Sequence, residues 1–289
     1  MLLTSCDEHQ RFRVSALTEK FNAEVIYLVP ILASLLFGLG CASLLITQQV
    51  TIYNVTPFPE ENVSGPFGNA LDFVIIIAVG ATVLYLLLKW KSRKLITFLT
   101  AFSMTLASLL VSVIYLSAVF SAVPDSWILV LILSVVVTVL FDLAIFRLGS
   151  KASSTAVICL GGALGVFFGA AIPVLSALLI LGFLAIYDVF TVYYGPVGKI
   201  AHSGLDQLKG LSFSFKDIQM GLGDLVFYSM LSGSMLFNFG WVSCLVSLVG
   251  ILAGSFITFL MLEKKGIFPG LPFPILLGLV GGLLVSLAI

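Results

Sequence analysis

The chain has 289 residues, of which 60% are hydrophobic and only 10% are charged, and its net charge at neutral pH is zero. Soluble domains carry about 25% charged residues, so this composition excludes an ordinary soluble protein and predicts one embedded in a membrane. The fourteen Lys and Arg residues are scattered along the chain, which argues against a nucleic-acid partner.

Taken in chain order, the apolar runs predict nine membrane-spanning helices, each near the ~20 residues that a bilayer core requires. The predicted spans cover residues 25–46, 71–88, 95–120, 127–146, 155–172, 174–194, 220–239, 244–262 and 269–289. The expected fold is therefore an all-α membrane protein with one membrane-embedded domain. Its parts are a tail at 1–24, spans one to six at 25–194, a polar loop at 195–219 and spans seven to nine at 220–289.

The basic residues give an independent check on this topology. All fourteen fall in the tail or in every second loop, at 89–94, 147–151, 195–219 and 263–266, and the alternate loops contain none. Lys and Arg collect on the cytoplasmic side of a membrane protein. The pattern therefore predicts a cytoplasmic N-terminus and a C-terminus outside. The first twenty residues show no apolar core of a signal peptide.

Residues that often bind metals or cofactors form no recognisable pattern. The four cysteines and two histidines lack metal-ligand spacing, and three of the cysteines lie in apolar runs as packing residues would. The sequence therefore predicts no metal site and no cofactor. These residues are Cys6, Cys41, Cys159, Cys244, His9 and His202.

Two aspartates lie inside predicted membrane spans. Asp188 is in the sixth span and Asp224 is near the start of the seventh. A carboxylate within a span costs roughly 2.5–3.5 kcal/mol on insertion scales, so each is a candidate functional residue. At 1.5 Å per residue, Asp188 lies roughly 12 Å and Asp224 roughly 10 Å from the cytoplasmic side. Adjacent antiparallel helices would bring two carboxyl groups at matching depth face to face.

Two facing carboxyl groups cannot both ionise easily, so they share a proton. In aspartic proteases such a pair divides its roles: one carboxylate is the general base on a water, and the other donates a hydrogen bond to the scissile carbonyl. Gly221 and Gly223 flank Asp224, and we expect their missing side chains to let another backbone approach.

Three further features of the spans carry weaker signals. Asp142 is a third carboxylate, near the inner end of the fourth span. The fifth span contains glycines at 161, 165 and 169, a spacing typical of a helix-packing face. Tyr187 precedes Asp188, and its hydroxyl either bonds within the site or belongs to a packing residue.

At this point three motifs resemble those of presenilins and signal peptide peptidases, the GxGD intramembrane aspartyl proteases. The motifs are Tyr187-Asp188, Gly221-Leu222-Gly223-Asp224 and Pro269-Gly270-Leu271-Pro272. They occur in the family's order on spans six, seven and nine. The stretch at 221–229 looks closer to presenilins than to signal peptide peptidases. The short 195–219 loop lacks the long insert in which eukaryotic presenilins are cut. The resemblance therefore implies a compact microbial homologue that works without being cut.

The resemblance implies that Asp188 and Asp224 are the catalytic pair of an intramembrane-cleaving aspartic endopeptidase. It assigns substrate positioning to Tyr187, Gly221, Leu222, Gly223, Pro269, Gly270, Leu271 and Pro272. The family's Pro-Ala-Leu has glycine at 270 here, which we expect to loosen the turn. The implied partners are single-span transmembrane substrates and the lipid bilayer; homo-oligomers and accessory subunits stay open.

Other classes of function remain to be weighed. A proton-coupled transporter or channel could use the same aspartates as relay sites, although such proteins usually contain repeated halves and none is visible here. A prepilin-type peptidase would explain the GxGD motif but not the nine spans or the Pro269–Pro272 turn. A catalytically silent scaffold would leave the pair of aspartates unexplained.

Overall fold

The computed structural model describes residues 22–50, 52–60, 64–90, 92–193, 212–215, 218–265 and 268–288. Within these ranges, seven helices are long and apolar enough to cross a membrane, and an eighth apolar helix is shorter. The elements in order are η1 (Val25–Leu28), α2 (Val29–Thr47), α3 (Ser64–Lys89), α4 (Arg93–Val119), α5 (Trp127–Phe146), α6 (Ser150–Ala171), α7 (Val174–Tyr193), β1 (Ser212–Phe215), β2 (Ile218–Gly221), α9 (Leu222–Lys265) and α10 (Pro272–Ala288).

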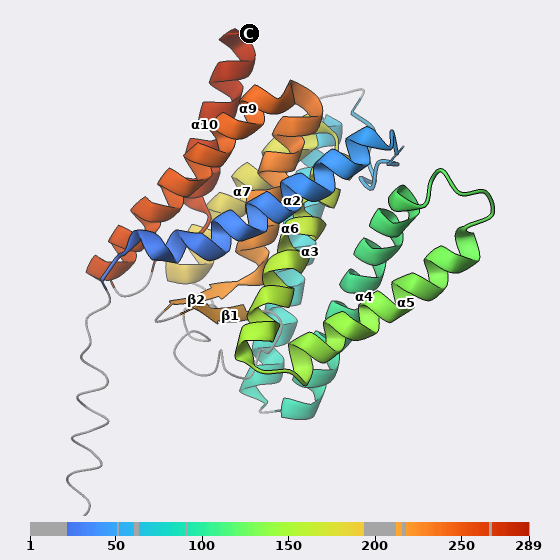
Figure 1. Cartoon of the computed structure of the whole chain (residues 1–289). Helices are drawn as coiled ribbons and strands as arrows, with labels where there is room; N and C mark the ends of the chain where they lie inside the picture. The colour runs from blue at the N-terminus through green and yellow to red at the C-terminus, as the bar shows by residue number, and fades with distance from the viewer. Residues whose placement is uncertain are drawn as a thin grey trace, which may run out of the picture.

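The longest helix, α9, consists of two helices joined at Gly240. This residue has φ 85° and ψ −177°, a left-handed conformation that glycine adopts without steric cost. Figure 1 shows the orange ribbon reversing direction at the end of its rising half. The turn predicted between spans seven and eight is therefore found, at the expected place.

Helix bounds agree best where polar residues end an apolar run. α5 has the predicted bounds, whereas α3 starts seven residues before the expected position 71. Its first turns contain Gly65, Pro66 and Asn69, which hydropathy does not count as membrane-spanning. Proline suits a first helical turn because it has no N–H to leave unpaired. The predicted tail at 1–24 and loop at 195–219 fall largely outside the described residues.

A two-stranded antiparallel sheet precedes α9 and was absent from the all-α prediction. Ser212 pairs with Gly221 and Phe215 with Ile218, so the second strand runs directly into the helix that carries Asp224. Alternation of Ser and Phe at 212–215 is the period-two signal of a strand. Only four residues carry it, too few to stand out beside spans of twenty.

Glycines bring the central helices together. α6 packs against α9, where a Cβ at Gly169 would lie 2.7 Å from the Met230 carbonyl oxygen and one at Gly165 would overlap the Val226 carbonyl. The glycine stripe of the fifth predicted span is thus a packing face. α9 also packs closely on α10, with Gly254 at the crossing. In Figure 1, α6 lies in the middle of the molecule and α10 at its left side, while α4 and α5 extend away to the right.

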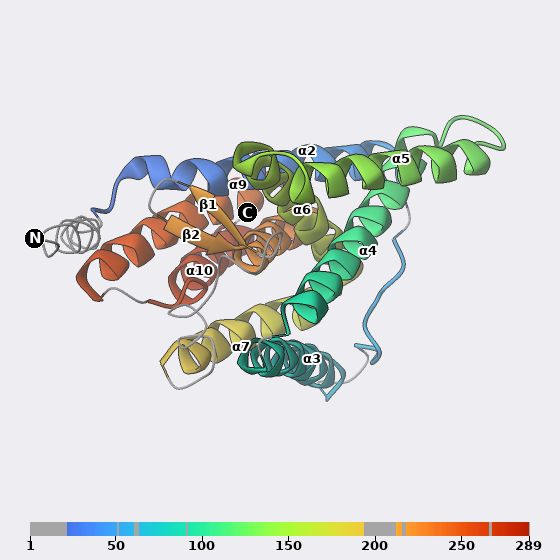
Figure 2. The same ribbon diagram turned by 90° about the horizontal axis from the view of Figure 1, so that it is seen from below.

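A polar cluster holds the end of α7 that is distant from Asp188. Glu60 accepts a hydrogen bond from the Ser176 N–H at 2.7 Å, in the first turn of α7. The Asn69 amide of α3 donates to the Ser176 hydroxyl at 2.9 Å. α3 and α7 lie side by side in Figure 2. These bonds therefore tie α7 to α3 and to the segment before it.

Candidate active site

Asp188 lies in the last part of α7, five residues before the helix ends at Tyr193. Its Oδ2 accepts a hydrogen bond of 3.0 Å from the backbone N–H of Leu271. Leu271 is 83 residues further along the chain and lies just before α10. This bond ties the carboxyl group of α7 to the turn that enters the last helix.

Asp224 lies in the first turn of α9, where free backbone N–H groups favour a carboxylate. Its Oδ2 is 3.1 Å from the position that a Cβ at Gly270 would occupy. Gly270 immediately precedes Leu271, so both carboxyl groups reach the same two-residue segment. They are also close enough to interact electrostatically. The structure thus brings together the two aspartates that the sequence singled out.

The segment between the aspartates is the Pro269–Pro272 turn. Pro269 and Leu271 are buried, and Pro272 begins α10. The Leu271 carbonyl accepts the first helical bond of α10, from the Ile275 N–H at 3.0 Å. The turn therefore presents one N–H to Asp188 and starts a helix with the carbonyl of the same residue.

Tyr228 is a site residue that sequence analysis missed. Its hydroxyl donates a hydrogen bond of 2.8 Å to the Gly270 carbonyl, and its side chain is only 1% exposed. It lies one helical turn after Asp224, so both are on the same face of α9. That i, i+4 spacing from an intramembrane aspartate is the signal that could have found it. Tyr228 fixes the turn from the side of α9, while Asp188 holds it from α7.

The glycines beside Asp224 have few neighbours among the described residues. A Cβ at Gly221 would have its nearest neighbour at 3.8 Å, in Asp224 itself, and one at Gly223 would meet only Phe227, also at 3.8 Å. Among the described residues, no backbone of another segment lies within 4 Å of these two positions, so the expected close approach of another backbone stays a prediction. Leu222, by contrast, is 8% exposed and belongs to the core. Within the described ranges, the space beside the two glycines is open.

The depth predicted for Asp224 assumes that the chain is helical from residue 217 onward. Residues 218–221 form strand β2 instead, and α9 begins only at Leu222. A strand advances about 3.3 Å per residue against 1.5 Å for a helix, so the calculated rise was wrong. The carboxyl groups nevertheless come together, because the hairpin places Asp224 at the start of its helix.

Comparisons with known proteins agree with this arrangement. Residues 198–288 match the Presenilin family model. The fold matches a solved structure described as a presenilin family intramembrane aspartate protease, with a TM-score of 0.66, 19% identity and coverage of 91% of this chain and 99% of the other. A second structure of that description gives 0.63, 21% identity, and 90% and 95% coverage. No match is found among curated protein sequences.

The resemblance to presenilins is confirmed. The family match contains Asp224, Tyr228 and the Pro269–Pro272 turn, whereas Asp188 lies before it. The structural match covers nine-tenths of the chain, so the presenilin-like fold extends beyond this segment to the helices before it. Both observations concern the same all-α, multi-pass membrane architecture.

Two other predicted residues take no part in the hydrogen bonds around the Pro269–Pro272 turn. Asp142 of α5 accepts a hydrogen bond of 2.7 Å from the Thr105 hydroxyl of α4, so it takes part in a different helix pair. Tyr187 is half-buried beside Asp188, and no hydrogen bond joins it to another described residue. Across the described ranges, no three His, Cys, Asp or Glu side chains gather as a metal site.

Proposed function

We propose that the protein is an intramembrane aspartyl protease that hydrolyses peptide bonds in the transmembrane helices of single-span membrane proteins. The observation that carries this proposal is the convergence of Asp188 and Asp224, from two helices, on the Gly270–Leu271 segment. Two carboxyl groups this close share a proton, which is the starting state of aspartic-protease chemistry.

The proposed mechanism gives the two carboxyl groups complementary roles. The ionised member takes a proton from a water, which attacks the scissile carbonyl, and the protonated member donates a hydrogen bond to the carbonyl oxygen. Collapse of the tetrahedral intermediate breaks the C–N bond, and the proton passes to the leaving amine. Tyr228 and the Pro269–Pro272 turn act as positioning groups, because they hold the backbone that contacts both aspartates.

A substrate helix must lose its internal hydrogen bonds before its backbone can react. Two features support binding of the extended form. The hairpin strand β2 leads directly into α9, and an extended peptide can add a strand to such an edge. Among the residues that the structure describes, none fills the space beside Gly221 and Gly223, which leaves room for another backbone beside Asp224. Peptide that stayed helical across the scissile bond would contradict this mode of binding.

The proposed membrane topology has nine spans within one embedded domain. α9 supplies two, because its halves are separated at Gly240, and α10 supplies the last. The basic residues place the N-terminus and the loop at 195–219 in the cytoplasm and the C-terminus outside. Asp188, near the end of α7 that enters this loop, then lies toward the cytoplasmic side, from which water reaches the pair.

The decisive experiment measures cleavage of a reporter single-span substrate in liposomes. Asp188→Ala and Asp224→Ala, each alone, should reduce cleavage by at least about 10³-fold, because residues that act as a unit fail together. Asp142→Asn is the matched control, since it removes an intramembrane charge away from the pair, and it should keep near-parental activity. A transition-state analogue of aspartic proteases should block the parent.

Near-parental cleavage by either aspartate variant would contradict the shared mechanism. An inactive parent with proton flux that depends on Asp188 and Asp224 would instead establish a proton-coupled transporter.

A further inference from the structure

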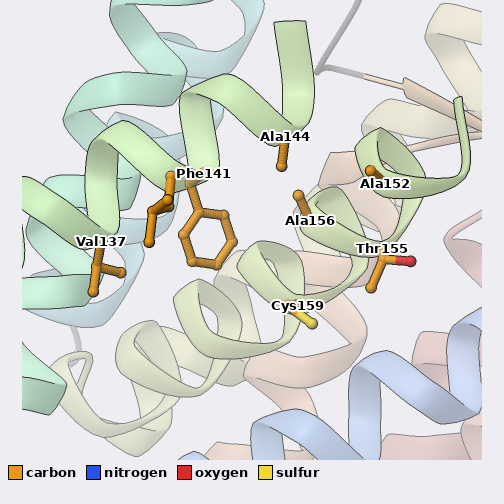
Figure 3. Close-up of a pocket in the computed structure, with 8 residues that line it drawn as sticks. Val137, Phe141, Ala144, Ala152, Thr155, Ala156 and Cys159 are labelled. Carbon is orange, nitrogen blue, oxygen red and sulfur yellow. The ribbon is translucent and has the colours of Figure 1, made fainter. Parts of the chain in front are cut away.

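A groove of about 480 Å³ lies between α5 and α6, away from the two aspartates. Its lining is apolar apart from the Thr155 hydroxyl, and Figure 3 shows side chains of both helices turned toward it. A volume of this size is typical of sites that take a small molecule or part of one. The catalytic proposal does not use this groove.

The groove follows the two helices for about two turns from the connection that joins them. Ala144 of α5 and Ala152 and Ala156 of α6 line the end near this connection, where their small side chains leave the space. Val137 and Cys159 line it further along. The shape is therefore an elongated slot that begins at the α5–α6 connection and runs along the helices.

The surroundings of the slot are those of a lipid-facing surface. Val136, Val139 and Leu143 of α5 are 48%, 50% and 44% exposed, and α5 has the highest hydropathy of the candidate spans. In a bilayer such a surface contacts acyl chains, so an acyl chain is the molecule available to enter the slot. Any phospholipid can supply one, and the slot alone would select none.

The connection at the mouth of the slot adds a charge. Arg147 and Lys151 are both exposed, and no ion pair joins either to another described residue. Ser150 starts α6, whose first-turn N–H groups point outward from a helix without a side-chain cap. Asp142, the carboxylate closest in sequence to Arg147, accepts a bond from Thr105 with Oδ2, and its Oδ1 is enclosed by protein. The mouth is therefore cationic, next to an apolar slot.

We propose that the α5–α6 groove binds an anionic phospholipid, with one acyl chain in the slot and the phosphate between Arg147 and Lys151. Basic residues at the membrane surface attract anionic headgroups, and pockets between helices on that side hold them. The apolar slot fixes the position of the lipid, and the two cations select its charge. Removing both cations should weaken binding by on the order of tenfold.

The test is native mass spectrometry of the protein in mild detergent with added phosphatidylglycerol or phosphatidylcholine of identical chains. The parent should retain phosphatidylglycerol about tenfold more strongly. The double variant Arg147→Gln/Lys151→Gln should lose this preference. Lys89→Gln/Lys94→Gln is the matched control: it removes two exposed cations from the α3–α4 connection and should leave the preference intact.

Filling the slot tests the apolar half of the proposal. Ala152→Phe should reduce retention of both lipids, whereas Val136→Phe places the same phenyl ring on the open surface of α5 and should not. Ala144→Leu is the second filling variant if Ala152→Phe does not purify as a monodisperse protein. Three outcomes would each overturn the proposal. The parent could retain the two lipids equally, or both double variants could lose the preference for phosphatidylglycerol equally. The third outcome is unchanged lipid binding in the filled variants.

Discussion

α5 and α6 are consecutive helices with opposite relations between hydropathy and burial. α5 has the highest mean hydropathy of the candidate spans, 3.0, yet only 22% of its 18-residue apolar window is buried. α6 has the lowest mean hydropathy, 1.8, and 61% of its window is buried. In a soluble protein the more apolar helix would occupy the core. Here it faces lipid, and the helix with glycines and alanines lies in the centre.

The difference follows from the solvent. Lipid is as apolar as leucine, so membrane helices gain no hydrophobic energy by burying large apolar side chains against each other. They associate through close packing, which small residues permit. Gly161, Gly165 and Gly169 let α6 approach the helix of Asp224. The same glycine contacts that make the core also determine where one catalytic candidate lies.

Among variants that test this difference between α6 and the lipid-facing helices, the largest change in stability should come from a methyl group added at Gly165. A Cβ there overlaps the Val226 carbonyl of α9, so Gly165→Ala should destabilise the protein by about 1–3 kcal/mol, as overpacking does. Gly80→Ala in lipid-facing α3 meets nothing within 4 Å and should stabilise its helix by up to about 1 kcal/mol. Thermal unfolding in one detergent measures both.

The two alanine variants share one chemical change, so only the packing around the glycine differs. Equal melting temperatures for Gly165→Ala and Gly80→Ala would break the distinction between a glycine-packed centre and a lipid-facing periphery.

A smaller effect is expected from removing the Tyr228 hydroxyl. Tyr228→Phe leaves the Gly270 carbonyl without its donor, and a net hydrogen bond contributes about 0.5–1.5 kcal/mol. Because this carbonyl belongs to the turn that contacts both aspartates, kcat for the reporter substrate should fall about tenfold. KM should change little.

Tyr115→Phe is the control for this prediction. Tyr115 of α4 makes an equivalent bond of 2.8 Å to the Ala163 carbonyl of α6, away from the aspartates. It should lower the melting temperature by a similar amount and leave kcat unchanged. Equal loss of kcat in the two variants would mean that Tyr228 contributes to stability only and does not position the site.

The smallest effect should come from placing the family's alanine at position 270. The new methyl would lie 3.1–3.4 Å from the Asp224 carboxyl group, which must move by a few tenths of an ångström. Gly270→Ala should therefore lower kcat by less than about fivefold, and it should stabilise the turn by about 0.4–1 kcal/mol through the unfolded chain. A loss of kcat above a hundredfold would mean that the glycine is required for the site.

Much of the architecture could be predicted from the sequence because a bilayer imposes long apolar runs and tolerates few charges within them. The bounds of α5, the reversal at 238–241 and the candidate aspartates all follow from that constraint. The glycine spacing in α6 likewise predicted a packing face, since small residues permit close approach at any point of a helix.

The sequence by itself thus determined which segments enter the membrane and which carboxyl groups are out of place there. Only the tertiary structure decided what those groups touch. The bond to Gly270 makes Tyr228 part of the site, and the bond from Thr105 of α4 assigns Asp142 to a different helix pair. Within spans that are apolar on every face, periodicity does not mark the buried side, so partners across helices emerge only when the chain is packed.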